Sequence, residues 1–114
     1  MNVSTKQAFS IFEDWKTKKS ALLIIRLINP PPGVSTDIAN FSGRIFRVDA
    51  SLGRVFVIEG TPTSGEHEIA FDLAGTSFAI APNIADPDGA SYAVTARLRG
   101  GGMIFFIEDF SRGT

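Results

Sequence analysis

The sequence contains no cysteine and a single histidine, His67. Without cysteine the chain has no disulfide, no thiol nucleophile, no Cys-ligated zinc and no iron–sulfur cluster. One histidine leaves little room for histidine-based catalysis or a His-rich metal site. An excess of charge of one sign is also missing, since 11 Lys and Arg stand against 12 Asp and Glu. A net charge of -1 provides no long-range field that would attract a polyanion.

Long hydrophobic runs are missing as well. The longest strong run, residues 21–28, includes Arg26 and is far shorter than the ~20 residues of a membrane-spanning helix. The first twenty residues hold no apolar segment with a cleavage site, so we expect a mature, unanchored cytoplasmic protein. No Walker A sequence, dinucleotide-binding glycine pattern or nucleophile elbow occurs. We therefore expect a non-enzymatic protein with no cofactor, no metal and no membrane partner.

What the chain does have is 44% hydrophobic residues over 114 positions, enough for the core of one domain spanning residues 1–114. Its beginning predicts a helix over residues 4–19. Ser4 and Gln7 have the spacing of a capping box. Apolar residues then recur at helical spacing: Ala8, Ile11, Phe12 and Trp15, with Phe9 widening the stripe. The last turn is basic and suits a solvated helix end better than an anion site: Lys16, Lys18 and Lys19.

After Ser20 the pattern changes to short β-rich runs separated by Gly, Pro, Asn and Asp. The runs predict seven strands, over residues 22–29, 41–49, 54–59, 68–73, 76–81, 92–99 and 103–108. This spacing is typical of a small barrel or sandwich. We therefore predict a mainly β fold, in which the N-terminal helix precedes a small, strongly bent antiparallel barrel over about residues 21–110. A parallel α/β fold is disfavoured because helical patterns do not recur between the strands.

Some predicted strands are apolar on both alternating faces, namely Leu22–Ile28, Val55–Ile58 and Met103–Ile107. One small barrel interior does not need so many apolar faces. Either the N-terminal helix covers the second faces or another copy of the chain does. We predict self-association through the last strand, because an unpaired strand edge offers free N–H and C=O groups. The predicted interface residues are Met103, Ile104, Phe105, Phe106 and Ile107.

Two short motifs resemble those of the Sm-like family of small β-barrels. The first is Gly43-Arg-Ile-Phe-Arg-Val-Asp49-Ala-Ser-Leu52-Gly53, in which a glycine permits a sharp strand bend and an aspartate precedes a tight turn. The second is Leu98-Arg99-Gly100, followed after two residues by an apolar strand. A helix before the first strand is also similar to that family. The resemblance covers less than half of the chain.

The resemblance implies an Sm/SH3-like barrel that assembles into a homo-oligomer and binds RNA. Its implied RNA contacts are Asp49, Arg99 and Gly100. The family's first motif usually carries a base-stacking aromatic or His two residues after the aspartate and an Asn two further on, where this chain has Ser51 and Gly53. The interval between the two motifs is longer than usual, which predicts an extra hairpin around residues 66–81.

A second resemblance concerns the same turn. Asp49-x-Ser51 with Gly53 resembles the D-x-S-x-x-G element of PilZ domains, which bind a cyclic dinucleotide, although the glycine comes one residue early. The arginine pair that those domains place upstream has no counterpart beyond Arg44 and Arg47, which lie within the strand. Three classes stay open: a self-assembling Sm-like module with weak RNA binding, a structural or protein-interaction domain, and a PilZ-like nucleotide-sensing domain.

Two clusters of titratable residues are candidates for a catalytic or metal site. His67 lies between Glu66 and Glu68, but adjacent strand residues point to opposite faces, so a polar surface hairpin is the better interpretation. Glu108 and Asp109 could form an acid pair, but they also diverge and are interpreted as the polar end of a strand.

Two loop segments have simple interpretations. Residues 83–89 carry the oxygen side chains of half a calcium loop but lack its later ligands, and Asp86-Pro-Asp-Gly89 predicts a turn. Pro30-Pro31-Pro32 predicts a stiff loop rather than a polyproline ligand.

Overall fold

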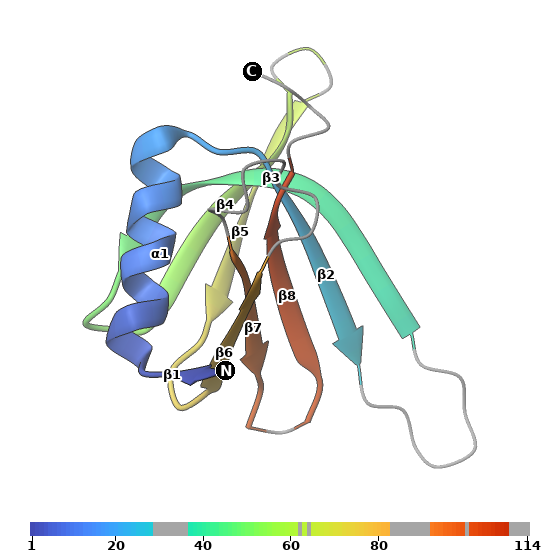
Figure 1. The fold of residues 1–114 in the computed structure, drawn as a ribbon. Coiled ribbons are helices and arrows are strands. Elements are labelled where there is room, and N and C mark those ends of the chain that lie inside the picture. Colours follow the sequence, from blue (N-terminus) through green and yellow to red (C-terminus); the bar gives the residue numbers. More distant parts are fainter. Residues whose placement is uncertain (29–36, 62, 64, 83–91, 100, 110–114) are drawn as a thin grey trace.

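The computed structural model describes residues 1–28, 37–61, 63, 65–82, 92–99 and 101–109 (Figure 1). Within these residues the elements follow in the order β1 (Asn2–Val3), α1 (Thr5–Lys18), β2 (Leu22–Ile28), β3 (Asp37–Asp49), β4 (Arg54–Thr61), β5 (Gly65–Asp72), β6 (Ser77–Pro82), β7 (Tyr92–Arg97) and β8 (Met103–Glu108). All seven predicted strands are present. The short strand β1 is one that the sequence did not predict.

The strands form one antiparallel sheet in the order β1-β6-β7-β8-β2-β3-β4-β5. The mainly β fold with one helix near the N-terminus is therefore confirmed. β1 and β5 stand at the two ends of this order, and no described backbone pairing joins them. The sheet is open, so a closed barrel is not observed. In the described part of the chain no helix has both the length and the apolar character needed to cross a membrane.

The prediction of a hairpin around residues 66–81 is wrong, because the two strands in this segment pair with other strands and not with each other. β5 pairs with β4, whereas β6 pairs with β7 and β1. The turn between β5 and β6 carries the chain from one end of the sheet order toward the other. Buried Leu73 anchors this turn, since its N–H donates to the Gly53 carbonyl at 2.7 Å and its own carbonyl accepts from the Thr76 N–H at 3.2 Å.

Helix α1 begins where the sequence predicts. The Gln7 N–H donates to Ser4 Oγ at 3.1 Å and the Ser4 N–H donates to Gln7 Oε1 at 2.9 Å, which completes the capping box. At the other end Lys19 adopts the left-handed conformation, with φ at 56°. Of the predicted stripe, Ile11 is half-buried and the other four residues are buried: Ala8, Phe9, Phe12 and Trp15.

Phe12 lies at the centre of the aromatic core. Its ring centroid lies 5.3 Å from that of Phe9, 6.0 Å from Trp15, 6.3 Å from Phe78 on β6 and 5.0 Å from Phe106 on β8. Contacts at this spacing, mostly edge to face, are favourable for aromatic pairs. They fix α1 against one face of the sheet, which curves around it (Figure 1).

Strand β3 is 13 residues long and bends over the molecule (Figure 1). At Gly43 a Cβ atom would lie 2.7 Å from the Ile58 carbonyl oxygen and 2.8 Å from Val57 Cγ1, so a side chain does not fit there. A β-bulge follows, since the register with β4 shifts between Ile45 and Arg47. Glycine and bulge together turn β3 around the core.

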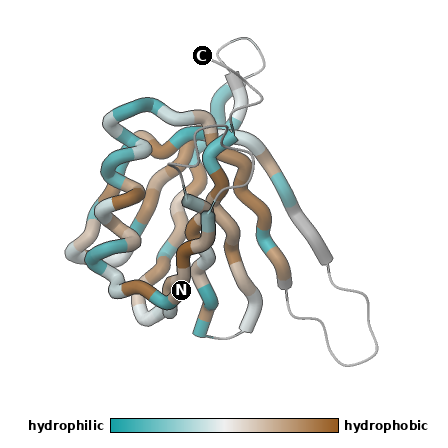
Figure 2. Tube along the Cα trace, in the orientation of Figure 1, coloured by the Kyte–Doolittle hydropathy of each residue, from teal (hydrophilic) through white to brown (hydrophobic). Residues whose placement is uncertain are grey.

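The central strands β2 and β8 have a second apolar face that α1 does not cover. Their core-facing residues, among them Ile24 and Phe106, are fully buried, and the alternate residues point to the other side. We call these alternate residues the outer apolar face: Leu23, Ile25, Leu27, Met103, Phe105 and Ile107, each half-buried. Figure 2 shows the hydrophobic character of the central strands. The alternative in which the helix covers the second face of Leu22–Ile28 is therefore wrong.

The prediction of a free edge on the last strand is also wrong. β8 lies inside the sheet, where β2 pairs with one of its edges and β7 with the other. Of the five predicted interface residues, Ile104 and Phe106 belong to the core, at 3% and 0% exposure. Self-association stays a prediction, and the side chains available for it on β8 are Met103, Phe105 and Ile107.

Candidate functional site

The two motifs of the Sm-like resemblance lie at the same end of the molecule. Gly53, in the β3–β4 turn, packs closely against the β5–β6 turn, where a Cβ added to Gly53 would lie 3.0 Å from Ala74 Cα. In the β5–β6 turn itself, a Cβ at Gly75 would lie 3.9 Å from Arg99 Cζ. The β5–β6 turn therefore stands between the hairpin that follows Asp49 and the side chain of Arg99. Gly100 lies outside the described residues.

Asp49 organises the turn that it begins. Its Oδ1 accepts a hydrogen bond from Ser51 Oγ at 2.7 Å and one from the Leu52 N–H at 3.3 Å. The Ser51 hydrogen bond is the main cause that lowers the pKa of Asp49. The Leu52 N–H and the charge of Arg47 act in the same direction, and partial desolvation opposes them. Asp49 thus has a structural role in this turn.

A row of arginines and aromatic rings lies on the outer side of β3 and β4. We call it the arginine–aromatic strip and define it as Arg44, Phe46, Arg47, Arg54 and Phe56. The Arg47 guanidinium lies 4.8 Å from the Phe56 ring centroid, within cation–π distance. The Phe46 and Phe56 centroids are 6.2 Å apart. All three arginines are exposed and both phenylalanines are half-buried.

The bulge in β3 creates this strip. In a regular strand Arg44 and Arg47, three positions apart, would point to opposite faces. Here Arg44 is opposite Ile58 and Arg47 is opposite Phe56, two residues apart on β4 and hence on one face. Arg54, opposite Asp49, continues the same face. The sequence-based prediction missed the strip because strict alternation would place the two arginines on opposite faces of β3. No residue pattern in the sequence predicts the bulge.

The strip has cationic groups that are not tied up in ion pairs with described carboxylates. Within the described part of the chain, the ion pairs join lysines of α1 to acidic residues: Lys16–Glu13, Lys18–Asp14 and Lys18–Glu108. In the sheet register Arg54 lies between Asp49 on β3 and Asp72 on β5. Arg47 lies opposite Phe56 on β4, and Phe56 in turn lies opposite Ala70 on β5. The three guanidiniums thus form no ion pair with a described carboxylate, although Asp49, two residues beyond Arg47 on β3, is close enough for the two charges to interact.

An open groove of about 610 Å³ adjoins the strip at Arg44. Its walls include Lys19 from the end of α1, Ser42 and Arg44 from β3, and Ile58 and Glu59 from β4. A volume of several hundred Å³ is of the size that small ligands occupy. Two cations, one carboxylate and a hydroxyl beside an aliphatic surface suit an anionic ligand that also has an apolar part.

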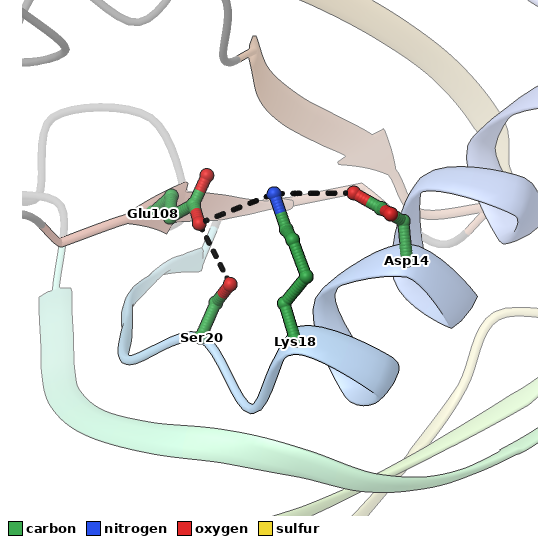
Figure 3. Close-up of polar contacts among 4 residues, drawn as sticks. All are labelled: Asp14, Lys18, Ser20 and Glu108. Carbon is green, nitrogen blue, oxygen red and sulfur yellow. Dashed lines mark hydrogen bonds and ion pairs between the residues drawn. The ribbon is translucent and has the colours of Figure 1, made fainter. Parts of the chain in front are cut away.

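A second polar cluster joins the helix to the last strand (Figure 3). Glu108, at 7% exposure, accepts a hydrogen bond from Ser20 Oγ at 2.7 Å. Lys18 Nζ lies 3.8 Å from the same carboxylate and 3.2 Å from that of Asp14. Asp109 follows, and its N–H donates to the Ala21 carbonyl at 2.8 Å. The contacts of Glu108 serve to hold α1 on the sheet, and a cavity of about 340 Å³ lies beside them.

The other predicted polar groups do not converge on a site. His67 and its neighbours Glu66 and Glu68 are exposed on β5, at the end of the sheet order, and alternate between its faces. Within the residues that the structure describes, no three acidic or histidine side chains are grouped as metal ligands. Residues 83–91, with the calcium-like segment, and the proline triplet at 30–32 lie outside the described residues.

Comparison with known protein families, with curated proteins and with solved structures finds no match for this chain.

Proposed function

We propose that this protein is a non-enzymatic, Sm-like module that binds single-stranded RNA weakly through the arginine–aromatic strip. The observation that carries the proposal is the Arg47 guanidinium 4.8 Å over the Phe56 ring centroid, with Arg44 and Arg54 on the same face. Single-stranded nucleic acids are bound by cations that follow the phosphates and by flat groups on which bases stack. A guanidinium plane is such a stacking group, and the ring behind it holds it in place.

The dimensions favour a short ligand. Between the register positions of Arg44 and Arg54 the strand advances four residues, from Ile58 to Arg54, or about 13 Å. This length suits a few nucleotides, at the lower end of the range of about 4–16 for small β-barrel modules. With a net charge of -1, the attraction is local, so we expect weak binding at physiological salt.

Sm-like architecture is part of this proposal. It is supported by a capped helix before the first long strand, by the sharp bend at Gly43 and by the position of Asp49 and Arg99 at one end of the molecule. In this interpretation β6–β7 is the added hairpin. Asp49, Arg99 and Gly100 keep the RNA-contacting role that the resemblance implies, and the strip extends toward them through Arg54. Cytoplasmic RNA is the corresponding partner.

The test is fluorescence anisotropy with labelled ten-residue oligouridine and oligoadenosine at several salt concentrations. If three arginines neutralise phosphates, log K should fall with log salt with a slope of about -2. Arg44→Ala and Arg47→Ala should each weaken binding several-fold. Arg26→Ala is the matched control, because Arg26 is an exposed arginine on β2 outside the strip. No binding at low salt, or equal losses in all three variants, would contradict the proposal and favour the protein-interaction alternative.

The PilZ-like alternative can be tested on the same groove. It requires a cyclic dinucleotide to bind near Lys19 and Arg44. Isothermal titration with cyclic dimeric GMP distinguishes it from the proposal, since tight binding of this ligand without binding of oligonucleotides would replace RNA as the ligand class.

A further inference from the structure

The outer apolar face on β2 and β8 has no charged or polar member. Its six side chains form direct cross-strand pairs: Leu23–Ile107, Ile25–Phe105 and Leu27–Met103. On the opposite side of the same strands, α1 and the aromatic core provide full cover, with Phe106 and Ile24 at 0% exposure. A contiguous apolar patch of a few hundred Å² is often a functional surface.

We infer that the outer apolar face binds the same face of a second copy of this chain. The first argument is charge. A binding molecule that placed Lys, Arg, Asp or Glu over these six residues would lose the hydration of those charged groups. It would gain no hydrogen bond or ion pair in return. The occupant must therefore be uncharged where it touches β2 and β8. This chain has such a surface in the face itself, and identical copies meeting across a two-fold axis make that contact self-complementary.

The flanking residues are compatible with this pairing. Beside the face, β7 contributes Ala93, Thr95 and Arg97, and β3 contributes Asn40 and Ser42. A two-fold axis through the central Ile25–Phe105 pair can run along the strands or across them. In either case the two copies of Arg97 end up about 13–14 Å apart. That distance exceeds the screening length of about 8 Å at physiological salt, so like charges do not oppose the contact.

The size of the face sets the strength of the dimer. The two strands of the face together with the flanking β7, at about 4.8 Å spacing, and six residues at about 3.3 Å each give a footprint of roughly 300 Å². Stable complexes bury about 800 Å² per partner. We therefore expect a weak dimer, with a Kd between about 10 µM and 1 mM. The arginine–aromatic strip begins at Arg44, two residues beyond Ser42 on the same face of β3, whereas the variants that test the dimer change Phe105 on β8 and leave the strip intact.

The experiment is sedimentation equilibrium over about 10 µM to 1 mM protein, a range that spans the expected Kd. Wild type should dimerise with rising concentration, and Phe105→Glu should raise the Kd about tenfold or more. Leu52→Glu is the control: it adds the same charge at a residue 53% exposed in the β3–β4 turn, and should dimerise as wild type does. A Phe105→Glu variant mixed with Phe105→Lys should recover a dimer, since Phe105 lies next to the proposed axis in both orientations.

The proposal is overturned if wild type is monomeric throughout this range or if Phe105→Glu dimerises as strongly as Leu52→Glu. If circular dichroism shows that the Phe105 variants do not fold, wild-type protein decides the question. Amide NMR shifts that change with concentration should then map to β2, β7 and β8, and shifts confined to the free edge of β5 would contradict the inference.

Discussion

The Ser20 hydroxyl donates a 2.7 Å hydrogen bond to the carboxylate of Glu108, and so links the segment just beyond α1 to the last residue of β8. Among the residues that the structure describes, Glu108 is the one charged residue that is buried. A carboxylate with little access to water depends on such donors, because its lost hydration must be replaced. The helix is thus held at its carboxyl end by a polar contact and along its length by aromatic packing.

Ser20→Ala should lower the free energy of unfolding by about 1–2 kcal/mol, since it leaves a buried acceptor with one donor fewer. Urea denaturation measures this change. Ser77→Ala, at an exposed serine of β6, is the control and should change stability little. In a Glu108→Gln background the effect of Ser20→Ala should shrink. An undiminished effect there would show that the serine acts through some other contact.

Phe12→Ala should cost about 3–5 kcal/mol, because it empties the centre of the aromatic core and leaves four rings without their common neighbour. Thermal or urea unfolding provides the measurement. The exposed Leu52 supplies the comparison, with Leu52→Ala expected within about 0.5 kcal/mol of wild type. Equal losses in the two variants would be incompatible with the position of Phe12.

Gly43→Ala should destabilise the fold by about 1–3 kcal/mol, since the added methyl group meets the Ile58 carbonyl oxygen and Val57 Cγ1 at less than 3 Å. Ser42→Ala, one position earlier on β3, introduces no such collision. The two variants can be compared by chemical denaturation. A neutral Gly43→Ala would mean that β3 does not need this close approach to bend.

Ser51→Ala should raise the pKa of Asp49 toward its ordinary value of 3.8, because the variant removes the largest cause of the lowered pKa. A lowered folded-state pKa stabilises the fold above the ordinary value, and this stabilisation is lost as the pH falls through the folded-state pKa. The part of the stability difference between wild type and Ser51→Ala that comes from the ionisation of Asp49 should therefore vanish in strong acid. Carboxyl-carbon NMR measures the titration, with Ser77→Ala as a variant that should leave it unchanged.

Arg47→Lys separates charge from stacking in the proposed RNA site. Lysine keeps the positive charge but lacks the plane that lies on Phe56, so affinity for oligonucleotides should fall several-fold while the salt slope persists. Arg47→Ala should reduce both quantities, the slope by about 0.7. Identical behaviour of the two variants in anisotropy titrations would argue against a stacked base.

Local patterns in the sequence are enough to predict the helix, its cap and seven of the strands. Ser4 and Gln7 predict the cap, and alternating apolar residues predict strands such as β5 and β7. Pairing partners are harder to predict, because β5 and β6 are joined by a short turn yet belong to different parts of the sheet. Such a choice depends on contacts between distant residues, such as Leu73 with Gly53, that no local pattern encodes.

The candidate site is only partly predictable for the same reason. Motifs single out Asp49 and Arg99, and these residues do lie at one end of the molecule. The shared face of Arg44 and Arg47 results from the register shift in β3, which depends on how β4 pairs with it. The sequence predicts an interface on β8 but assigns its edge wrongly, because the pairing with β7 is not local.

The position of β8 has a consequence for the order in which this protein folds. Strands β2 to β5 are successive neighbours, and β6 and β7 form a separate hairpin, so β8 is the strand that connects the two groups. On a ribosome β8 emerges after all the other strands. We expect the two groups to be linked only through α1 until then, and the complete sheet to form late, in one cooperative step governed by contacts between distant parts of the chain.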